Sequence, residues 1–268
     1  MSLIEQTKQA EPLDIEATIA DLRDRTTKEL ADKYNSFNMI LLGPLGVGKT
    51  SILETARRPV IVHSFDPGGC NLRNFMPLIE SGDIIADVAY ETEDNKNPSA
   101  YMKWEMEFER LKNAGVFNNI GTFCIDSFTT FITAMKNEIC KRKGRPNSIP
   151  QIQDYMEMGI NIVNIIKLCT ALPCDFILTG HLTLEKDEVS GRFLARFKSF
   201  PSLQIDVPLL FDEIYVMQAE ETREGVERRL ITQSTGKYEA RTRIGARLFD
   251  VYEQADIQYL LKKAGRIQ

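Results

Sequence analysis

The sequence has few of the residues that build disulfide or zinc sites. It contains five cysteines and two histidines among 268 residues, and no two cysteines stand in a C-x-x-C pair. An odd set of cysteines without paired spacing indicates reduced thiols in a reducing compartment rather than a disulfide framework. With His63 and His181 as the only histidines, a cysteine–histidine zinc site is not expected.

Long apolar runs are also missing from the sequence. No stretch approaches the ~18 to 20 apolar residues that span a bilayer, and the first residues, MSLIEQTKQAEPLD, lack the apolar centre of an export signal. Lysine and arginine number 33 against 38 aspartates and glutamates, a net charge of −5. This excludes a histone-like surface but allows a local basic groove. We therefore expect a soluble cytoplasmic protein that does not enter a membrane.

From residue 38 onward, short apolar runs alternate with helical patterns. Near-continuous apolar runs of strand length are typical of strands buried on both faces of a parallel sheet. Their alternation with helices predicts an α/β domain, with a mostly parallel twisted sheet and helices on both faces. The strand runs cover residues 39–42, 60–62, 120–125, 176–179 and 214–217, and the helical patterns cover 49–56, 101–113, 129–143 and 151–171.

Residues 1–36 differ in character from the rest. They form a polar tail followed by apolar residues at near-helical spacing, namely Ile15, Ile19, Leu22 and Leu30. Such a helix packs on its own domain or serves as an arm that docks on a neighbouring subunit, and periodicity alone does not choose between them. Residues 37–268 are expected to form one domain that ends in a helix.

The segment Gly43-Pro44-Leu45-Gly46-Val47-Gly48-Lys49-Thr50 matches the phosphate-loop pattern G-x-x-x-x-G-K-[ST] in full. An apolar strand precedes it and a helix-forming stretch follows. Glycines let backbone N–H groups surround a phosphate, and a helix N-terminus adds a positive dipole end. Lys49 is expected to contact the β- and γ-phosphates, and Thr50 to supply a hydroxyl to Mg²⁺. The expected nucleotide contacts are Gly43, Gly46, Val47, Gly48, Lys49, Thr50 and Ser51.

A carboxylate at the end of a neighbouring strand would complete the Mg²⁺ site. Asp126 ends the apolar run 121–126, at the edge where ligands gather in open parallel sheets. Its alternative role is to cap the following helix, and the two roles are compatible. The sequence favours ATP over GTP, because Asn95-Lys96-Asn97-Pro98 has proline where a guanine-reading N-K-x-D element needs aspartate.

Taken in order, these motifs resemble the RecA-like ATPases. The similarity is strongest to the phage-encoded, single-domain AAA-type nucleotide-binding proteins that include single-strand annealing recombinases, and it covers residues 37–250. It implies a RecA-like P-loop core that uses ATP and Mg²⁺ in the cytoplasm of a bacterial or phage-infected host cell. The segments that carry it are 39–50, 60–64 followed by Asp66-Pro67-Gly68-Gly69, Cys124-Ile125-Asp126-Ser127 and Leu178-Thr179-Gly180-His181.

The resemblance also implies two roles beside the phosphates. Asp66 stands where the family has an acidic residue, usually glutamate, that orients or deprotonates the attacking water; the shorter aspartate puts efficient hydrolysis in question. Its alternative is a turn residue opening Asp-Pro-Gly-Gly. His181 stands where the family has a polar sensor of the γ-phosphate, and its alternative is a structural histidine.

The segment 190–200 interleaves basic and aromatic residues without an acid. Basic groups contact phosphates, and aromatic faces stack on bases without reading sequence, as single-strand binding requires. The segment is therefore predicted to be a DNA-binding loop, with a core strand or a substrate lid as alternatives. A second basic cluster, residues 136–145, either contacts DNA or interacts favourably with the dipole at a helix C-terminus. The expected DNA contacts are Arg192, Phe193, Arg196, Phe197 and Lys198.

Residues 236–243 follow a predicted strand at 228–232 and carry Lys237, Arg241 and Arg243. The resemblance implies that such cations enter the ATP site of a neighbouring subunit and neutralise charge on the transferred phosphoryl group. Hydrolysis would then require a homo-oligomer, either a ring or a filament. The expected catalytic residues are Lys49, Asp66, Asp126, His181, Arg241 and Arg243.

Together these features favour an ATPase that binds single-stranded DNA and promotes annealing or strand exchange in phage-type recombination, with a single-strand binding protein as a further partner. Two alternatives stay open. One is a nucleotide-gated motor or structural subunit in DNA packaging or remodelling. The other is a small-molecule kinase of the P-loop type, in which Arg192 and Arg196 belong to a lid.

Overall fold

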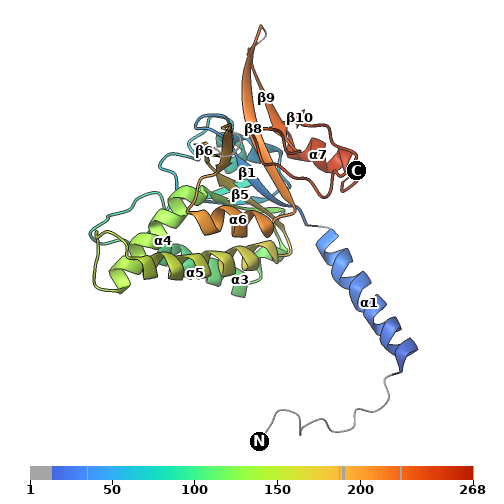
Figure 1. The fold of residues 1–268 in the computed structure, drawn as a ribbon, viewed down its shortest axis with the longest axis horizontal. Coiled ribbons are helices and arrows are strands. Elements are labelled where there is room, and N and C mark those ends of the chain that lie inside the picture. Colours follow the sequence, from blue (N-terminus) through green and yellow to red (C-terminus); the bar gives the residue numbers. More distant parts are fainter. Residues whose placement is uncertain (1–13, 35, 187, 189–190, 224, 268) are drawn as a thin grey trace, which may run out of the picture. The chain divides into compact units, whose positions relative to one another are not determined.

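The computed structural model describes residues 14–34, 36–186, 188, 191–223 and 225–267 (Figure 1). The chain divides into two compact units, Met1–Ser36 and Phe37–Gln268. The described part of the first unit is helix α1, Ile15–Tyr34. Asp14 caps this helix, because its carboxylate accepts a hydrogen bond from the Ala17 N–H at 3.1 Å.

The second unit is built on an eight-stranded sheet with the order β10-β9-β8-β1-β5-β4-β2-β3. The strands from β8 to β3 in this order pair in parallel, whereas β9 and β10 add antiparallel strands at one edge. A separate antiparallel pair joins β6 and β7. The strands are β1 Asn38–Leu42, β2 Val60–Ser64, β3 Ile84–Asp87, β4 Thr122–Asp126, β5 Asp175–Gly180, β6 Leu182–Lys186, β7 Phe193–Phe197, β8 Glu213–Thr222, β9 Gly225–Ile231 and β10 Tyr252–Gln254.

Helices cover both faces of this sheet. Alternate strand residues point to opposite faces, so Ile40 and Leu42 join one core while Met39 and Leu41 join the other. Helices α3 to α6 pack on the first core, and the 3-10 helix η2 and helix α7 pack on the second. The expected α/β core, with a mostly parallel sheet between helical layers, is confirmed. The helices are α2 Met76–Glu80, α3 Ala100–Asn113, α4 Phe128–Arg142, α5 Ile152–Thr170, α6 Pro201–Leu209 and α7 Ile257–Lys263, with 3-10 helices η2 Ser51–Thr55 and η3 Val116–Asn118.

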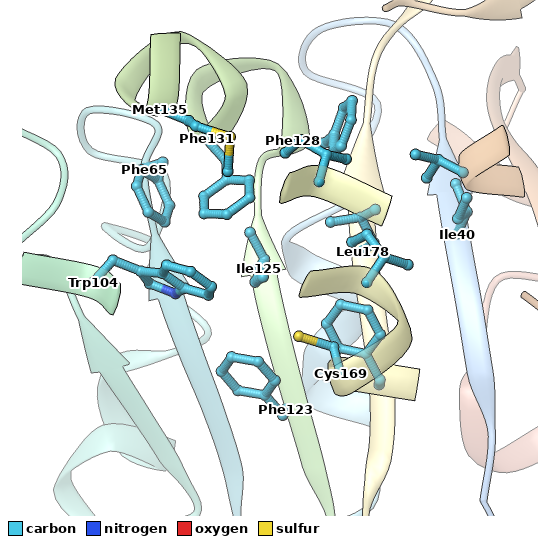
Figure 2. Close-up of a cluster of buried hydrophobic side chains, with 14 of the residues drawn as sticks. Ile40, Phe65, Trp104, Phe123, Ile125, Phe128, Phe131, Met135, Cys169 and Leu178 are labelled. Atoms are coloured by element: carbon cyan, nitrogen blue, oxygen red, sulfur yellow. The ribbon is translucent and has the colours of Figure 1, made fainter. Parts of the chain in front are cut away.

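The first core is rich in aromatic rings (Figure 2). Trp104 of α3 meets Phe131 of α4 edge to face, with ring centroids 4.7 Å apart. Phe123 of β4 stacks on Phe176 of β5 at 5.7 Å. Burial of each such side chain stabilises the fold by about 1.5–3 kcal/mol. This packing fixes β4 against its neighbours and so fixes the position of Asp126 at the end of that strand.

Two predicted elements are wrong. Residues 49–56 do not form an α-helix, since only the 3-10 helix η2 follows the phosphate loop. Ala56 is already extended, and the Thr55 hydroxyl donates to the Ile52 carbonyl at 2.7 Å, which ends the turn so that the chain can enter β2. Within the predicted loop 190–200, residues 193–197 form strand β7, which pairs with β6 in antiparallel fashion.

None of the helices in the described ranges has the length and apolar character that crossing a bilayer requires.

Candidate nucleotide site

The phosphate loop joins the end of β1 to η2, and its glycines are required by its backbone. Gly46 and Gly48 have φ angles of +72° and +107°, in the left-handed region that favours glycine. Gly43 is required by space instead, since a Cβ there would lie 2.9 Å from Val47 Cγ1 and 3.0 Å from the Met217 carbonyl oxygen. The motif residues therefore form the tight turn that the sequence predicts.

Lys49 is buried within this loop. Its Nζ donates hydrogen bonds to the Gly43 and Pro44 carbonyl oxygens at 3.1 and 2.9 Å. Burial lowers the pKa of Lys49, whereas the nearby carboxylates of Asp126 and Asp66 raise it. These carbonyls hold the ammonium group beside the cavity, where phosphate oxygens would be stronger, charged acceptors.

Asp126, at the end of β4, is the acceptor for two hydroxyl groups. Its Oδ2 accepts from Thr50 Oγ1 at 2.6 Å, and its Oδ1 accepts a short hydrogen bond from Thr179 Oγ1. Burial raises the pKa of Asp126, while the hydrogen bonds from Thr179 and Thr50 lower it. Thr179 comes from β5 and was not expected to take part, although it lies two residues before the predicted sensor histidine.

The oxygen donors at Thr50 and Asp126 fit Mg²⁺. A carboxylate and a hydroxyl are hard ligands, and Mg²⁺ in such sites keeps several waters and binds substrate phosphates instead of filling a protein cage. The described residues contain no group of three or more His, Cys, Asp or Glu side chains that could hold a metal ion.

Asp66 follows β2 and faces the start of α4. Its Oδ1 accepts hydrogen bonds from Ser127 Oγ at 3.0 Å and from Thr130 Oγ1 at 2.5 Å. It shares a cavity of about 190 Å³ with Lys49 and Asp126. One carboxylate oxygen is therefore committed to the protein, and Oδ2 is the oxygen with which Asp66 could orient a water.

Glu91 is a site residue that the sequence reasoning missed. Its two carboxylate oxygens accept from Ser64 Oγ at 2.6 Å and from the Gly68 N–H at 2.8 Å. These bonds fix the turn that carries Asp66. Glu91 lies 27 residues beyond Ser64 in the chain and belongs to no motif, so no pattern in the sequence could have revealed it.

His181 follows β5 directly and lines the same cavity as Lys49, Asp66 and Asp126. Its Nδ1 lies 3.2 Å from Thr129 Oγ1. Burial and the positive charge of Lys49 lower the pKa of His181, which favours the neutral ring. The β6–β7 hairpin begins at the next residue, so a change at this ring is adjacent to the hairpin.

A second, larger cavity adjoins the phosphate loop. It has a volume of about 850 Å³, shares Gly48 and Ser51 with the first cavity, and extends to Tyr252 of β10. Arg228 of β9 lies at the junction, where its Nε donates to the Val47 carbonyl oxygen at 2.9 Å. A Cβ on Gly48 would come within 2.7 Å of the same nitrogen. Arg228 was also missed, because it lies 181 residues from the loop it contacts.

The two expected trans-acting arginines are engaged within their own chain. Arg241 Nη2 donates to the carbonyl oxygens of Pro208 and Phe211 at 3.0 and 2.5 Å, which gives this side chain a structural role. Arg243 Nη1 pairs with Asp212 at 2.5 Å on the surface. The contacts of Arg241 do not fit a cation that projects into a neighbour, whereas those of Arg243 leave it at the surface.

The β6–β7 hairpin buries some of the expected DNA-binding residues and exposes others. Phe197 is buried, with its ring 4.7 Å from that of Phe128, and so it is a core residue and not a stacking platform. Phe193, in contrast, is 59% exposed. Arg196 pairs with Glu185 at 3.6 Å. The alternative of a core strand is thus right for Phe197, and the exposed candidates are Arg192, Phe193 and Lys198.

Three cations of the second basic cluster pair with carboxylates of their own chain. Lys143 and Arg145 both bind the buried carboxylate of Asp154, at 2.9 Å each, and together with the Gln151 N–H they hold the pKa of Asp154 far below its usual value. Arg142 pairs with Glu138 in the same way at 2.9 Å. Lys143 and Arg145 thereby join the end of α4 to α5, which favours a structural role for these two cations.

Comparison with known proteins gives one family and a set of distant structures. A family model described as an AAA domain matches residues 35–244. The chain is similar to the solved structure of a KaiC-like protein from Pyrococcus horikoshii OT3, at 15% identity over 77% of this chain and 82% of that one, with a TM-score of 0.43. It is also similar to the flagellar accessory protein FlaH from Methanocaldococcus jannaschii, at 16% identity over 76% and 79%, with a TM-score of 0.40. No curated protein matches the sequence.

Proposed function

The chain belongs to the AAA domain family, and from this we propose that it binds ATP with Mg²⁺ and hydrolyses it. The observation that carries the proposal is the meeting of Lys49, Thr50 and Asp126 around one small cavity, although they come from two distant segments of the chain. A cation, a hydroxyl and a carboxylate in this arrangement are what a metal-bound polyphosphate needs.

The two adjoining cavities support a whole nucleotide as the ligand. The cavity of about 190 Å³ has room for phosphate groups and the metal, and the cavity of about 850 Å³ beyond Gly48 and Ser51 has room for the nucleoside. Tyr252, which is 49% exposed on the wall of the larger cavity, offers an aromatic face to a base.

The residues around the smaller cavity suggest how hydrolysis would proceed. Lys49 would exchange its carbonyl partners for phosphate oxygens and neutralise their charge, and Mg²⁺, held through Thr50 and Asp126, would supply further neutralisation when bound. Asp66 would orient the attacking water through Oδ2. Because its Oδ1 is already bound to two hydroxyl groups, we expect slow turnover in the absence of a stimulating ligand.

The finer part of the proposal is that single-stranded DNA is this ligand. The β6–β7 hairpin begins beside His181, which lines the nucleotide cavity, so DNA on the hairpin and nucleotide in the cavity would affect each other. Phe193 would stack on a base, while Arg192 and Lys198 would contact phosphates. We infer annealing or strand exchange as the reaction, by a homo-oligomer that works with a single-strand binding protein.

An oligomer would also complete the catalytic centre. Lys237 and Arg243 are the cations that we propose to act on the ATP of a neighbouring subunit. Neither contact described for them, the ring of Tyr238 for Lys237 and the exposed Asp212 for Arg243, buries the charge. The rate per subunit should then rise with protein concentration.

Nucleotide binding is tested by calorimetry with Mg·ATP on the Lys49→Ala variant. Loss of a charged hydrogen bond to phosphate should weaken binding by about 10- to 100-fold. Lys103→Ala, which removes an exposed lysine from α3, is the matched control and should bind like the parent protein. Unchanged binding by the Lys49 variant would refute the proposal.

The DNA proposal is tested by fluorescence anisotropy with an oligonucleotide and by ATPase rates with and without it. Phe193→Ala and Arg192→Ala should weaken DNA binding and reduce the stimulation, whereas Met106→Ala, at an exposed apolar residue of α3, should not. If DNA binds and the protein assembles on it without any stimulated hydrolysis, the nucleotide-gated structural subunit is the better description. A P-loop kinase would instead transfer phosphate to a nucleoside or nucleotide.

A further inference from the structure

Arg228 of β9 is a positively charged side chain beside the phosphate loop. Alternate residues of a strand point to opposite faces of the sheet, and Leu230 packs in the second core, so Arg228 lies on the face of that core. Val47 of the loop and residues of η2 pack in the same core. Ala219 stands opposite Arg228 in β8, and its small side chain leaves the arginine room to reach the loop.

Arg228 touches the loop through one edge of its guanidinium group. Its Nε donates to the Val47 carbonyl oxygen at 2.9 Å, and a Cβ on Gly48 would lie 2.7 Å from Nε and 3.0 Å from Cδ. Nη1 and Nη2 have no hydrogen-bond partner among the residues that the structure describes. A guanidinium group carries N–H donors on all of its nitrogens, so the donors of Nη1 and Nη2 are available to a ligand.

The carboxylates that line the larger cavity with Arg228 have partners of their own. Three glutamates belong to this lining, and each binds another side chain of the described part of the chain instead of Arg228. An exposed arginine whose charge is not matched by these acids suits an anion, and the planar guanidinium group fits the oxygens of a phosphate. The three pairs are Glu54 with Asn74, Glu227 with Arg229, and Glu253 with Lys263.

The place of Arg228 along a nucleotide follows from the two cavities. The smaller cavity contains Lys49 and suits the terminal phosphates, whereas the larger one contains Tyr252 and suits the nucleoside. Gly48 and Ser51 line both cavities, so the phosphate that joins the nucleoside to the terminal phosphates would lie beside them. Arg228 packs against Gly48 at this junction. Its free donors are therefore close to the position of an α-phosphate.

We propose that Arg228 binds the α-phosphate of the nucleotide through Nη1 and Nη2. This inference rests on the proposed nucleotide site, and it adds to that site a cation that belongs to no motif. The nucleotide then joins the phosphate loop, which follows β1, to β9. β10 pairs with residues 229–231 of β9, and in the described part of the chain residues 225–228 have no partner strand on that side. Ligand binding therefore steadies this end of β9.

Calorimetry on the full chain with Mg·ADP and its two α-thio diastereomers tests the contact. Each diastereomer has sulfur, a weaker acceptor, in place of one of the two non-bridging α-oxygens. The parent protein should bind one diastereomer about 5-fold more weakly than the other, because only one of these oxygens faces Arg228. Arg228→Ala should weaken ADP binding by about 10-fold and should bind both diastereomers alike.

Two further variants separate the contact from a general effect of charge or of loop structure. Arg229→Ala removes the same charge one residue further along β9, where Glu227 already pairs with it, and should bind ADP like the parent protein. Arg228→Lys keeps a cation at the junction and should recover part of the affinity. A purely structural role in holding Val47 would weaken both diastereomers equally and leave their difference unchanged.

Hydrogen exchange supplies the second measurement. Saturating Mg·ADP should slow the exchange of the backbone amides of residues 225–228 at least about fivefold in the parent protein, because the ligand connects this end of β9 to the phosphate loop. The same amides should not respond in Arg228→Ala at saturating Mg·ADP.

Three results would overturn the proposed contact. These are an Arg228→Ala variant that binds ADP like the parent protein, a difference between the diastereomers that persists in that variant, and amides of β9 that do not respond to ADP in the parent. If Lys49→Ala loses nucleotide binding while Arg228→Ala keeps it, the Arg228 contact is refuted and the proposed nucleotide site stands. A parent protein that binds neither Mg·ATP nor Mg·ADP would refute both.

Discussion

Replacing Asp175 by asparagine should make the stability of the protein rise with pH between about 4 and 6.5, where the parent protein should change little. In this pH range the titrations of two buried groups change the free energy of unfolding in opposite directions. Burial raises the pKa of Asp175 from 3.8 to about 7, against the influence of Arg57 and the Phe37 N–H. Burial lowers the pKa of His63 from 6.5 to about 4, against Asp87 and Glu107.

The sign of each contribution follows from proton binding. Between pH 4 and 6.5 folded Asp175 keeps a proton that the unfolded chain has lost, so its contribution to stability falls as pH rises. Folded His63 lacks a proton that the unfolded chain still binds, so its contribution rises. At about 1.4 kcal/mol per pH unit, each change amounts to about 3 kcal/mol across this range, and the two nearly cancel.

Urea unfolding at a series of pH values measures the effect. Asp175→Asn keeps an oxygen that can accept the Phe37 N–H, bonded at 2.8 Å in the parent, and it removes the falling contribution. His63→Phe fits among the rings of Phe123 and Tyr90, removes the rising contribution, and should therefore lose about 3 kcal/mol as pH rises. Asp24→Asn, at an exposed site on α1, is the control. Parallel profiles for the parent and the Asp175 variant would refute the reasoning.

Three further predictions concern single side chains. Phe193→Ala should weaken single-stranded DNA binding by at least about 5-fold at constant stability, whereas Phe197→Ala should cost about 3–5 kcal/mol of stability because its ring is buried; anisotropy and urea unfolding separate the two. Thr179→Val removes a hydrogen bond to Asp126, the carboxylate that we propose to hold Mg²⁺, and should raise the Mg²⁺ concentration for half-maximal ATPase activity by about 10-fold, as measured by Mg²⁺ titration. Gly121→Ala would bring a Cβ within 2.4 Å of a backbone carbonyl oxygen and should cost about 1–3 kcal/mol, while Gly236→Ala, with no atom within 4 Å, should stay within about 0.5 kcal/mol in the same unfolding assay.

The sheet could be predicted from the sequence because its strands are buried on both faces. Continuous apolar runs such as residues 39–42 leave no polar face, which is typical of a central parallel strand. The segment 190–200, which contains β7, is predicted as a loop instead, because basic and aromatic residues are interleaved in it without a regular polar alternation. Which side chains of β7 are buried depends on packing against α4. A local sequence pattern does not contain this information.

The site could be predicted only where its residues lie within a motif. The phosphate loop and Asp126 follow from local patterns, and both meet at Thr50. Glu91 and Arg228 reach the site from segments without a motif, through contacts that form only when distant strands align. Arg241 is the opposite case. The resemblance implies a catalytic cation at this position, whereas the hydrogen bonds of Arg241 to carbonyl oxygens favour a structural role.

The position of β1 in the sheet has a consequence for folding during synthesis on the ribosome. β1 carries the phosphate loop and pairs with β5 on one side and β8 on the other, and the first contact with β5 spans 138 residues of chain. A nascent chain released early would present an apolar strand with two open edges, which is a template for aggregation. The phosphate loop of such a fragment would also lack the hydrogen bond that Arg228 donates to the Val47 carbonyl oxygen.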